Sequence, residues 1–137
     1  MTVTAGEKRI VTLLREAKTI AVVGLSSKSW RSSYGIAQYL QKHGYRVIPV
    51  NPMENEVLGE KSYASLKDIP EHVDVVNVFR RSEFVPEIAD DAIEIGAGAL
   101  WLQLGVVHEE AARKAAAAGL TVVMDRCISV DHSLLVR

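Results

Sequence analysis

The segment from Thr19 to Gly35 constrains the fold more than any other part of this chain. It begins as a short β-branched run, passes through a loop rich in glycine and serine, and reaches a helix start at Ser32 or Ser33. A strand that leads into a helix through small residues forms an anion site, because the backbone N–H groups and the helix dipole both favour a phosphate. We therefore expect a phosphate-bearing ligand at this loop.

Short apolar runs alternate with amphipathic stretches along the rest of the chain. The expected strands are residues 20–23, 46–50, 73–79, 99–103 and 120–124, and the expected helices are 5–17, 33–43 and 109–118, with a further helical stripe at 85–93. This alternation predicts an α/β, Rossmann-like fold with a five-stranded, mainly parallel sheet and helices on both faces. We expect the strand order 3-2-1-4-5. Loops 24–33 and 103–105 would then open at a ligand crevice between strands one and four.

Size and charge narrow the function. The 137 residues predict a single domain, 1–137, with an N-terminal helix within residues 1–18 packed on it. A net charge of −1 without a long basic run argues against nucleic acid, and no apolar stretch predicts a membrane span. One cysteine, Cys127, excludes an internal disulfide framework, and together with the lack of a signal sequence it indicates the cytoplasm. The scattered histidines predict no metal site, and no catalytic constellation is present.

The Gly/Ser loop supplies the first candidate residues. Gly24 either lets the backbone approach a pyrophosphate or makes an ordinary tight turn. The hydroxyls of Ser26, Ser27, Ser32 and Ser33 can donate to phosphate oxygens, although serines are common in loops of any kind. The loop matches neither the P-loop nor the G-x-G-x-x-G pattern. Strand two ends in Asn51, where NAD-binding domains usually carry an acid for the ribose, so NAD is disfavoured but stays open.

Cations gather at the same expected edge of the sheet. Lys28 and Arg31 lie in the loop, and Arg80 and Arg81 end strand three. Each one alone is consistent with a solvated surface charge. Together, on a nearly neutral chain, they favour a ligand with more phosphate charge than NAD carries.

The aromatic residues and the thiol each leave two interpretations open. Tyr34 and Trp30 border the loop and either cover the ligand or pack at the helix entry. Trp101, between two leucines, is more typical of a core residue than of a stacking platform. Cys127 is either a buried, inert thiol or a reactive one beside Arg126 at the sheet edge.

Several motifs spread from about residue 15 to about residue 132 carry a resemblance when they are taken together. They are IAVVGLSSK at 20–28, R-x-SY at 31–34, VIPVNP at 47–52, GEK-x-Y at 59–63, VFRRS at 78–82, WLQLG at 101–105 and VMDRC at 123–127. In this combination the chain resembles the small, single-domain CoA-binding proteins, which are similar to the CoA-binding N-terminal domain of the succinyl-CoA synthetase α subunit.

The resemblance implies CoA or acyl-CoA bound along the carboxyl ends of the strands. It implies phosphate contacts from the loop, an adenosine side near Asn51–Pro52 and Val78–Arg80, and a pantetheine end near Trp101–Gln103 and Cys127. The predicted ligand-binding residues are Gly24, Leu25, Ser26, Ser27, Lys28, Arg31, Ser33, Tyr34, Asn51, Pro52, Val78, Phe79, Arg80, Trp101, Gln103, Gly105 and Cys127.

The chain also departs from that family. The synthetase's second domain, with its phosphorylated histidine, has no counterpart in this length, and Ile128–Asp131 replaces a segment that many members carry after the cysteine. We therefore expect non-catalytic binding of CoA or acyl-CoA, with no expectation about a protein partner. Two alternatives stay open: an NAD- or nucleotide-binding redox sensor, and thiol-dependent acyl or CoA-disulfide exchange at Cys127.

Overall fold

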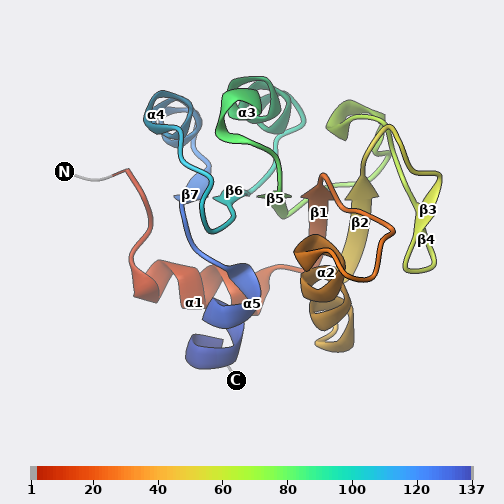
Figure 1. The fold of residues 1–137 in the computed structure, drawn as a ribbon. Helices are drawn as coiled ribbons and strands as arrows, with labels where there is room; N and C mark the ends of the chain where they lie inside the picture. Colours follow the sequence, from red (N-terminus) through yellow and green to blue (C-terminus); the bar gives the residue numbers. More distant parts are fainter. Residues whose placement is uncertain (1–2, 137) are drawn as a thin grey trace.

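A five-stranded parallel sheet forms the centre of the molecule, as the computed structural model describes it for residues 3–136 (Figure 1). Its strands in spatial order are β2 (Arg46–Val50), β1 (Thr19–Val23), β5 (Val75–Val78), β6 (Ala99–Leu102) and β7 (Thr121–Val123). Nearly every residue of these strands is buried, as expected for a sheet that is covered on both faces. The predicted α/β, Rossmann-like class is confirmed.

The predicted strand order is wrong. Counting the five strands along the chain, the order is 2-1-3-4-5, because β1 pairs with β5 in the register Ile20 to Val75 and not with β6. Strand β2 is therefore an edge strand, which explains how it tolerates Pro49, a residue without an N–H group. The point where the strand order reverses, and where a crevice forms in such sheets, lies between β1 and β5.

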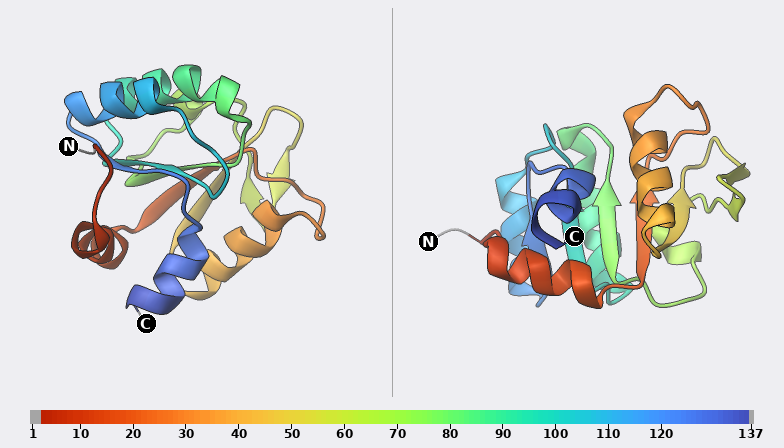
Figure 2. Two further views of the ribbon diagram at one scale, coloured as in Figure 1. Left: turned by 60° about the vertical axis from the view of Figure 1, so that its left-hand side comes forward. Right: turned by 90° about the horizontal axis from the view of Figure 1, so that it is seen from below.

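Helices cover both faces of the sheet (Figures 1 and 2). One face carries α1 (Glu7–Glu16), α2 (Ser32–Lys42) and α5 (Ile128–Asp131), which continues as the π-helical turn η3 (His132–Val136). The other face carries α3 (Val85–Glu94) and α4 (Glu109–Ala117). Helix α1 begins after Gly6, which provides no side-chain cap.

Each face has its own apolar core. On the α1, α2 and α5 side, Leu14, Leu40, Trp101 and Ile128 are almost fully buried. On the α3 and α4 side, small buried residues are concentrated in the helices, which lets them pack closely on Leu100 and its neighbours. Burying one large apolar side chain contributes about 1.5–3 kcal/mol, so both cores hold the strands firmly in place.

The connection from β2 to β5 is irregular. It contains the short antiparallel pair β3 (Glu56–Val57) and β4 (Glu60–Lys61), then the 3-10 turn η1 (Leu66–Asp68); a further 3-10 turn, η2 (Ser82–Phe84), precedes α3. The Tyr63 backbone binds the outer edge of β2, since its N–H donates to the Pro49 carbonyl over 3.0 Å. Among residues 3–136, no helix is both long enough and apolar enough to cross a membrane.

Candidate functional site

Gly24 ends β1 and lies where three strand ends meet. Its φ of +89° is in the left-handed region, its N–H donates to the Val50 carbonyl over 2.8 Å, and an added Cβ would lie 2.7 Å from the carbonyl oxygen of Phe79. Only glycine combines that φ with such a close approach. The packing of β2 and β5 therefore requires Gly24, whether or not a ligand binds here.

In the loop after Gly24, several N–H groups that were expected to be available to a phosphate already donate hydrogen bonds within the protein. The Ser26 N–H donates to the Ser33 hydroxyl over 3.2 Å, and the Lys28 N–H donates to the Ser26 hydroxyl over 3.1 Å. The Ser27 N–H donates to a carboxylate oxygen of Glu54 over 2.8 Å. These three loop donors thus have partners within the protein, and Leu25 is fully buried beneath them.

Asn51 joins the end of β2 to the same loop. Its side-chain amide donates to the Leu25 carbonyl over 3.0 Å, and its side-chain oxygen accepts from the Met53 N–H over 2.9 Å. Asn51 therefore fixes the Gly/Ser loop relative to the turn that follows β2. This turn places the Glu54 carboxylate beside the Ser27 N–H.

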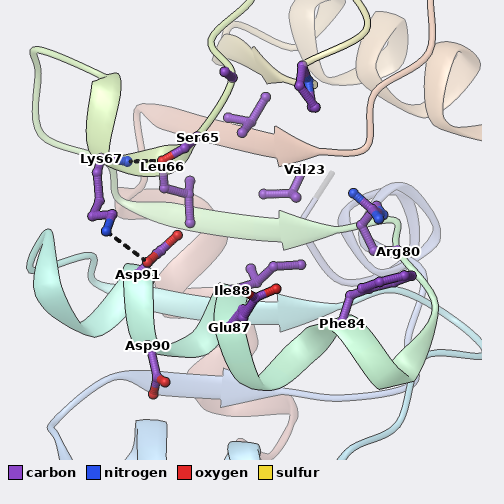
Figure 3. A pocket seen from close by; sticks show the side chains of 13 residues that line it. Val23, Ser65, Leu66, Lys67, Arg80, Phe84, Glu87, Ile88, Asp90 and Asp91 are labelled. Carbon is purple, nitrogen blue, oxygen red and sulfur yellow. Dashed lines mark hydrogen bonds and ion pairs between the residues drawn. The ribbon is translucent and has the colours of Figure 1, made fainter.

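A first pocket, of about 460 Å³, lies on the α3 face of the sheet, and we name it the α3-side pocket (Figure 3). Arg80 and Phe84 lie at one end, with the guanidinium carbon 4.4 Å from the ring centre, and Lys67 and Asp91 lie at the other, 3.8 Å apart. Its floor includes Val23, and Pro52 belongs to its wall. Burial is the main cause that raises the pKa of Asp91; the Lys67 charge opposes it, and nearby carboxylates add to it.

A second pocket, of about 580 Å³, lies on the α2 face of the sheet, and we name it the α2-side pocket. Its polar lining includes Ser32 at the start of α2, the arginines Arg80 and Arg81, and the carboxamide of Gln103. Its remaining lining residues are Ile36, Phe79, Leu104, Gly105, Val106 and Cys127. Arg80 lines both pockets, so the two meet at the end of β5, beside Gly24.

Cys127 precedes α5 and lies in the α2-side pocket. Burial raises the pKa of its thiol, but hydrogen bonds from the Ser129 hydroxyl, the Val130 and Ser129 backbone and Gln103 outweigh this, so the pKa lies below its ordinary value. The Ser129 hydroxyl lies 3.3 Å from the sulfur. Arg126, which the sequence places beside the thiol, forms an ion pair with Asp131 instead, with a closest distance of 2.7 Å.

The predicted site residues separate into those that line the pockets and those that do not. Pro52, Phe79, Arg80, Gln103, Gly105 and Cys127 line one or both of them. Trp101 and Val78 are fully buried, and the Trp101 indole donates to the Arg126 carbonyl over 2.9 Å, so the tryptophan supports the turn before Cys127 from the core. The other predicted residues belong to the loop, the start of α2 and the β2 end, and they line neither pocket. Within that group Lys28 and Arg31 are exposed and Tyr34 is half-buried.

Sequence reasoning missed two polar residues of this region. Glu54 follows the β2 end in an N-P-M-E turn, and only its reach back to Ser27 reveals its place. Asn77 is fully buried in β5; its amide group donates to the Gln103 carboxamide oxygen over 3.3 Å, and its own oxygen is a buried side-chain atom without a partner among the described residues. A lone polar residue in an otherwise apolar strand was the available signal. Within residues 3–136 no cluster of three or more His, Cys, Asp or Glu side chains could hold a metal ion.

Comparisons with known sequences find similarity to CoA-binding domains over most of the chain. A family model described as a CoA binding domain matches residues 18–133. The protein YneT of Bacillus subtilis (strain 168) is 46% identical over 122 residues, which cover 89% of this chain and 90% of YneT. The acetate–CoA ligase (ADP-forming) II of Archaeoglobus fulgidus is 30% identical over 95 residues, which cover 67% of this chain but only 14% of the ligase.

Solved structures show the same fold at two levels of similarity. A hypothetical protein from Pyrococcus horikoshii OT3 superposes with a TM-score of 0.93 at 39% identity, covering 97% of this chain and 94% of that one. A dinucleotide-forming acetyl-coenzyme A synthetase 1 from Ca. Korarchaeum cryptofilum superposes with a TM-score of 0.69 at 27% identity, covering 79% of this chain and 26% of the synthetase. With its family model matched over most of its length, the chain belongs to the family of CoA-binding domains.

Proposed function

We propose that this protein binds CoA or acyl-CoA across the carboxyl ends of its strands and has no catalytic activity of its own. The observation that carries the proposal is the pair of pockets that meet at Arg80, where the strand order reverses. Parallel α/β sheets bind ligands at that point, and a long ligand with a charged middle needs two connected pockets with a cation between them.

The residues at this edge fit the parts of CoA. Helix α2 begins at Ser32 without a side-chain cap on its first turn, so its N–H groups and dipole favour the pyrophosphate. Arg80 and Arg81 supply cations for phosphate oxygens. The α2-side pocket, with its apolar lining and Cys127, suits the pantetheine arm, and the α3-side pocket near Pro52 suits the adenosine. Predicted contacts from Lys28, Arg31 and the loop serines belong to this proposal.

Calorimetry with CoA, dephospho-CoA and NAD tests the proposal directly. CoA should bind 1:1 and more tightly than NAD, because its additional phosphate has cations to meet and no carboxylate occupies the Asn51 position that usually binds a ribose. NAD binding as tight as that of CoA would reject the proposal in favour of a nucleotide sensor. Native mass spectrometry of freshly purified protein should show co-purified CoA.

A second function is favoured by the thiol in the α2-side pocket. In thiol–disulfide exchange, the Cys127 thiolate would attack one sulfur of CoA disulfide, form a mixed disulfide with that CoA and release the other as a thiolate. The lowered pKa of Cys127 supports this chemistry. Incubation with CoA disulfide should add the mass of one CoA to the wild type and none to Cys127→Ser, which should still bind CoA reversibly.

We also propose a cytoplasmic location, a small-molecule CoA ligand and neither nucleic acid nor membrane as a partner. The relatives named as ligases carry this domain as a small part of a larger protein. A protein partner that supplies chemistry to the bound ligand would therefore be consistent with the family. Co-purification of such a partner with the CoA-loaded protein, and not with the Arg80→Ala variant, would identify it.

A further inference from the structure

The Gly/Ser loop after β1, which we call the phosphate loop here, already binds a carboxylate of the protein itself. Glu54 reaches from the turn after β2, and its carboxylate accepts the Ser27 N–H over 2.8 Å. The Ser27 hydroxyl also contributes to lowering the pKa of this carboxylate. The neighbouring donors at Ser26 and Lys28 bond only to neutral hydroxyls. Of these three loop donors, therefore, Ser27 alone has a charged acceptor, as it would with a phosphate.

The contact has the character of a charge-assisted bond. The Ser27 backbone is the main cause that holds the pKa of Glu54 below its ordinary value; the Ser27 hydroxyl and the Lys28 charge act in the same direction, and slight burial opposes them. Glu54 is thus ionised at neutral pH. A ligand phosphate at the same N–H would face this carboxylate at short range, and two like charges there repel.

The turn that carries Glu54 is held independently of that carboxylate. Asn51 bonds to the Leu25 carbonyl over 3.0 Å and to the Met53 N–H over 2.9 Å. Only the Glu54 side chain has to rotate to release the Ser27 N–H, and the backbone of both segments can stay in place. Exchange of one anion for another at Ser27 therefore needs no rearrangement of the fold.

We propose that Glu54 is the resident anion of the phosphate loop and sets the affinity for CoA, because a ligand phosphate must replace it at the Ser27 N–H. The inference rests on the proposed function and adds the residue that limits binding. Glu54 lowers the affinity for phosphate-bearing ligands and keeps the loop ordered while no ligand is bound.

Calorimetric titration of CoA into wild type, Glu54→Gln and Glu56→Gln tests this. Glu54→Gln keeps the shape and an acceptor but removes the charge, so CoA should bind about two- to tenfold more tightly, the range for an exposed charged group. Glu56→Gln removes the same charge from exposed β3, where no described hydrogen bond joins it to the loop, and should bind like wild type. Glu54→Asp keeps the charge and should stay within about twofold of wild type.

The outcomes separate this inference from the proposed function. Normal CoA binding by all variants would overturn the role of Glu54 and leave CoA binding intact. Weaker CoA binding by Glu54→Gln would also overturn the role of Glu54, because it would show that the Glu54 carboxylate accepts a hydrogen bond from a hydroxyl of the ligand. Absence of CoA binding in every protein, including the wild type, would overturn both.

Discussion

The two pockets that share Arg80 have opposite electrostatic character. Among residues 3–136, Arg80 and Arg81 line the α2-side pocket and no carboxylate does, although Arg81 contacts Glu83 beside it at 3.4 Å. Of the described residues, the carboxylates of Glu87, Asp90 and Asp91 and the two cations Lys67 and Arg80 line the α3-side pocket. Two of the three acids of the α3-side pocket are already paired, since Asp91 contacts Lys67 at 3.8 Å and Asp90 contacts Lys114 at 2.7 Å.

This difference teaches where each part of a ligand can bind. Phosphates need uncompensated cations, so we propose that they bind at Arg80 and toward the α2-side pocket. The adenine base is uncharged and tolerates a surface whose charges are mostly paired, so we propose the α3-side pocket for the base, with the additional phosphate of CoA directed toward Arg80. One arginine at the boundary then contributes to both, and changes at this boundary should have larger effects than changes within either pocket.

Replacing Gly24 should have the largest effect, because Gly24 lies beside the boundary. Gly24→Val would place a Cβ 2.7 Å from the Phe79 carbonyl and 3.1 Å from Cδ of Arg80, on a backbone with φ +89°. We expect loss of CoA binding and a decrease of about 2–4 kcal/mol in the free energy of unfolding, measured by urea denaturation.

A matched glycine separates strain from collision. Gly44 has a φ of +91°, but nothing lies within 4 Å of an added Cβ. Gly44→Ala should therefore cost only the left-handed strain, about 1–2 kcal/mol, whereas Gly24→Ala should cost more. Equal losses for the two alanine variants would show that the Phe79 carbonyl moves aside readily.

Arg80→Ala should produce the next largest effect. If Arg80 contacts phosphates at the boundary, CoA affinity should fall about 10- to 100-fold, as expected for a charge-assisted contact. Arg15→Ala is the control, because Arg15 is exposed in the last turn of α1, just before β1 begins and so away from the carboxyl ends. At higher salt, the CoA affinities of wild type and Arg80→Ala should differ less, because salt screens the charge of Arg80. An Arg80→Ala variant with wild-type CoA affinity would contradict the proposal that CoA binds across the two pockets that meet at Arg80.

Thiol labelling tests the α2-side pocket alone. With its pKa lowered, Cys127 should be alkylated in the native state, and the rate should reach half its maximum at a lower pH than for free cysteine. Bound CoA should slow alkylation about tenfold by covering the pocket. A thiol that reacts only in denaturant would exclude Cys127 from the ligand site.

The smallest effect should come from Asp91 in the α3-side pocket. Burial raises its pKa, so the folded chain binds this proton more tightly than the unfolded chain does. The free energy of unfolding should therefore fall as pH rises from the ordinary carboxyl pKa to the raised one. Asp91→Asn should lack this dependence, gain less than about 1 kcal/mol at neutral pH and keep its CoA affinity. The control is Asp90→Asn, which removes a neighbouring carboxylate that pairs with Lys114 and leaves Asp91 in place.

The sequence predicted which segments form strands better than it predicted their neighbours. Apolar, β-branched runs are easily recognised, but β5 and β6 carry similar patterns, and nothing local says which of them pairs with β1. One signal was present: Pro49 in β2 indicates an edge strand, and the predicted order placed that strand in the interior. Strand order depends on how the connecting segments pack, which is a tertiary property.

The candidate site divides in the same way. Residues at strand ends, such as Gly24, Arg80 and Cys127, were predictable because a strand boundary fixes where they lie. The Glu54–Ser27 contact was not, because it joins segments 27 residues apart. The pairing of Arg126 with Asp131 was also missed, since it depends on the turn into α5.

Helix α5 and η3 complete the face of the sheet that α1 and α2 also cover, and α5 begins directly after Cys127 (Figure 2). Ile128 is fully buried against elements from the first half of the chain. During synthesis on the ribosome, the sheet, the Gly/Ser loop, α1 and α2 emerge first, while the part of that face under α5 and η3 stays uncovered. The α2-side pocket is therefore complete only after Cys127 has left the exit tunnel, so ligand capture at the thiol should come later than capture at the Gly/Ser loop.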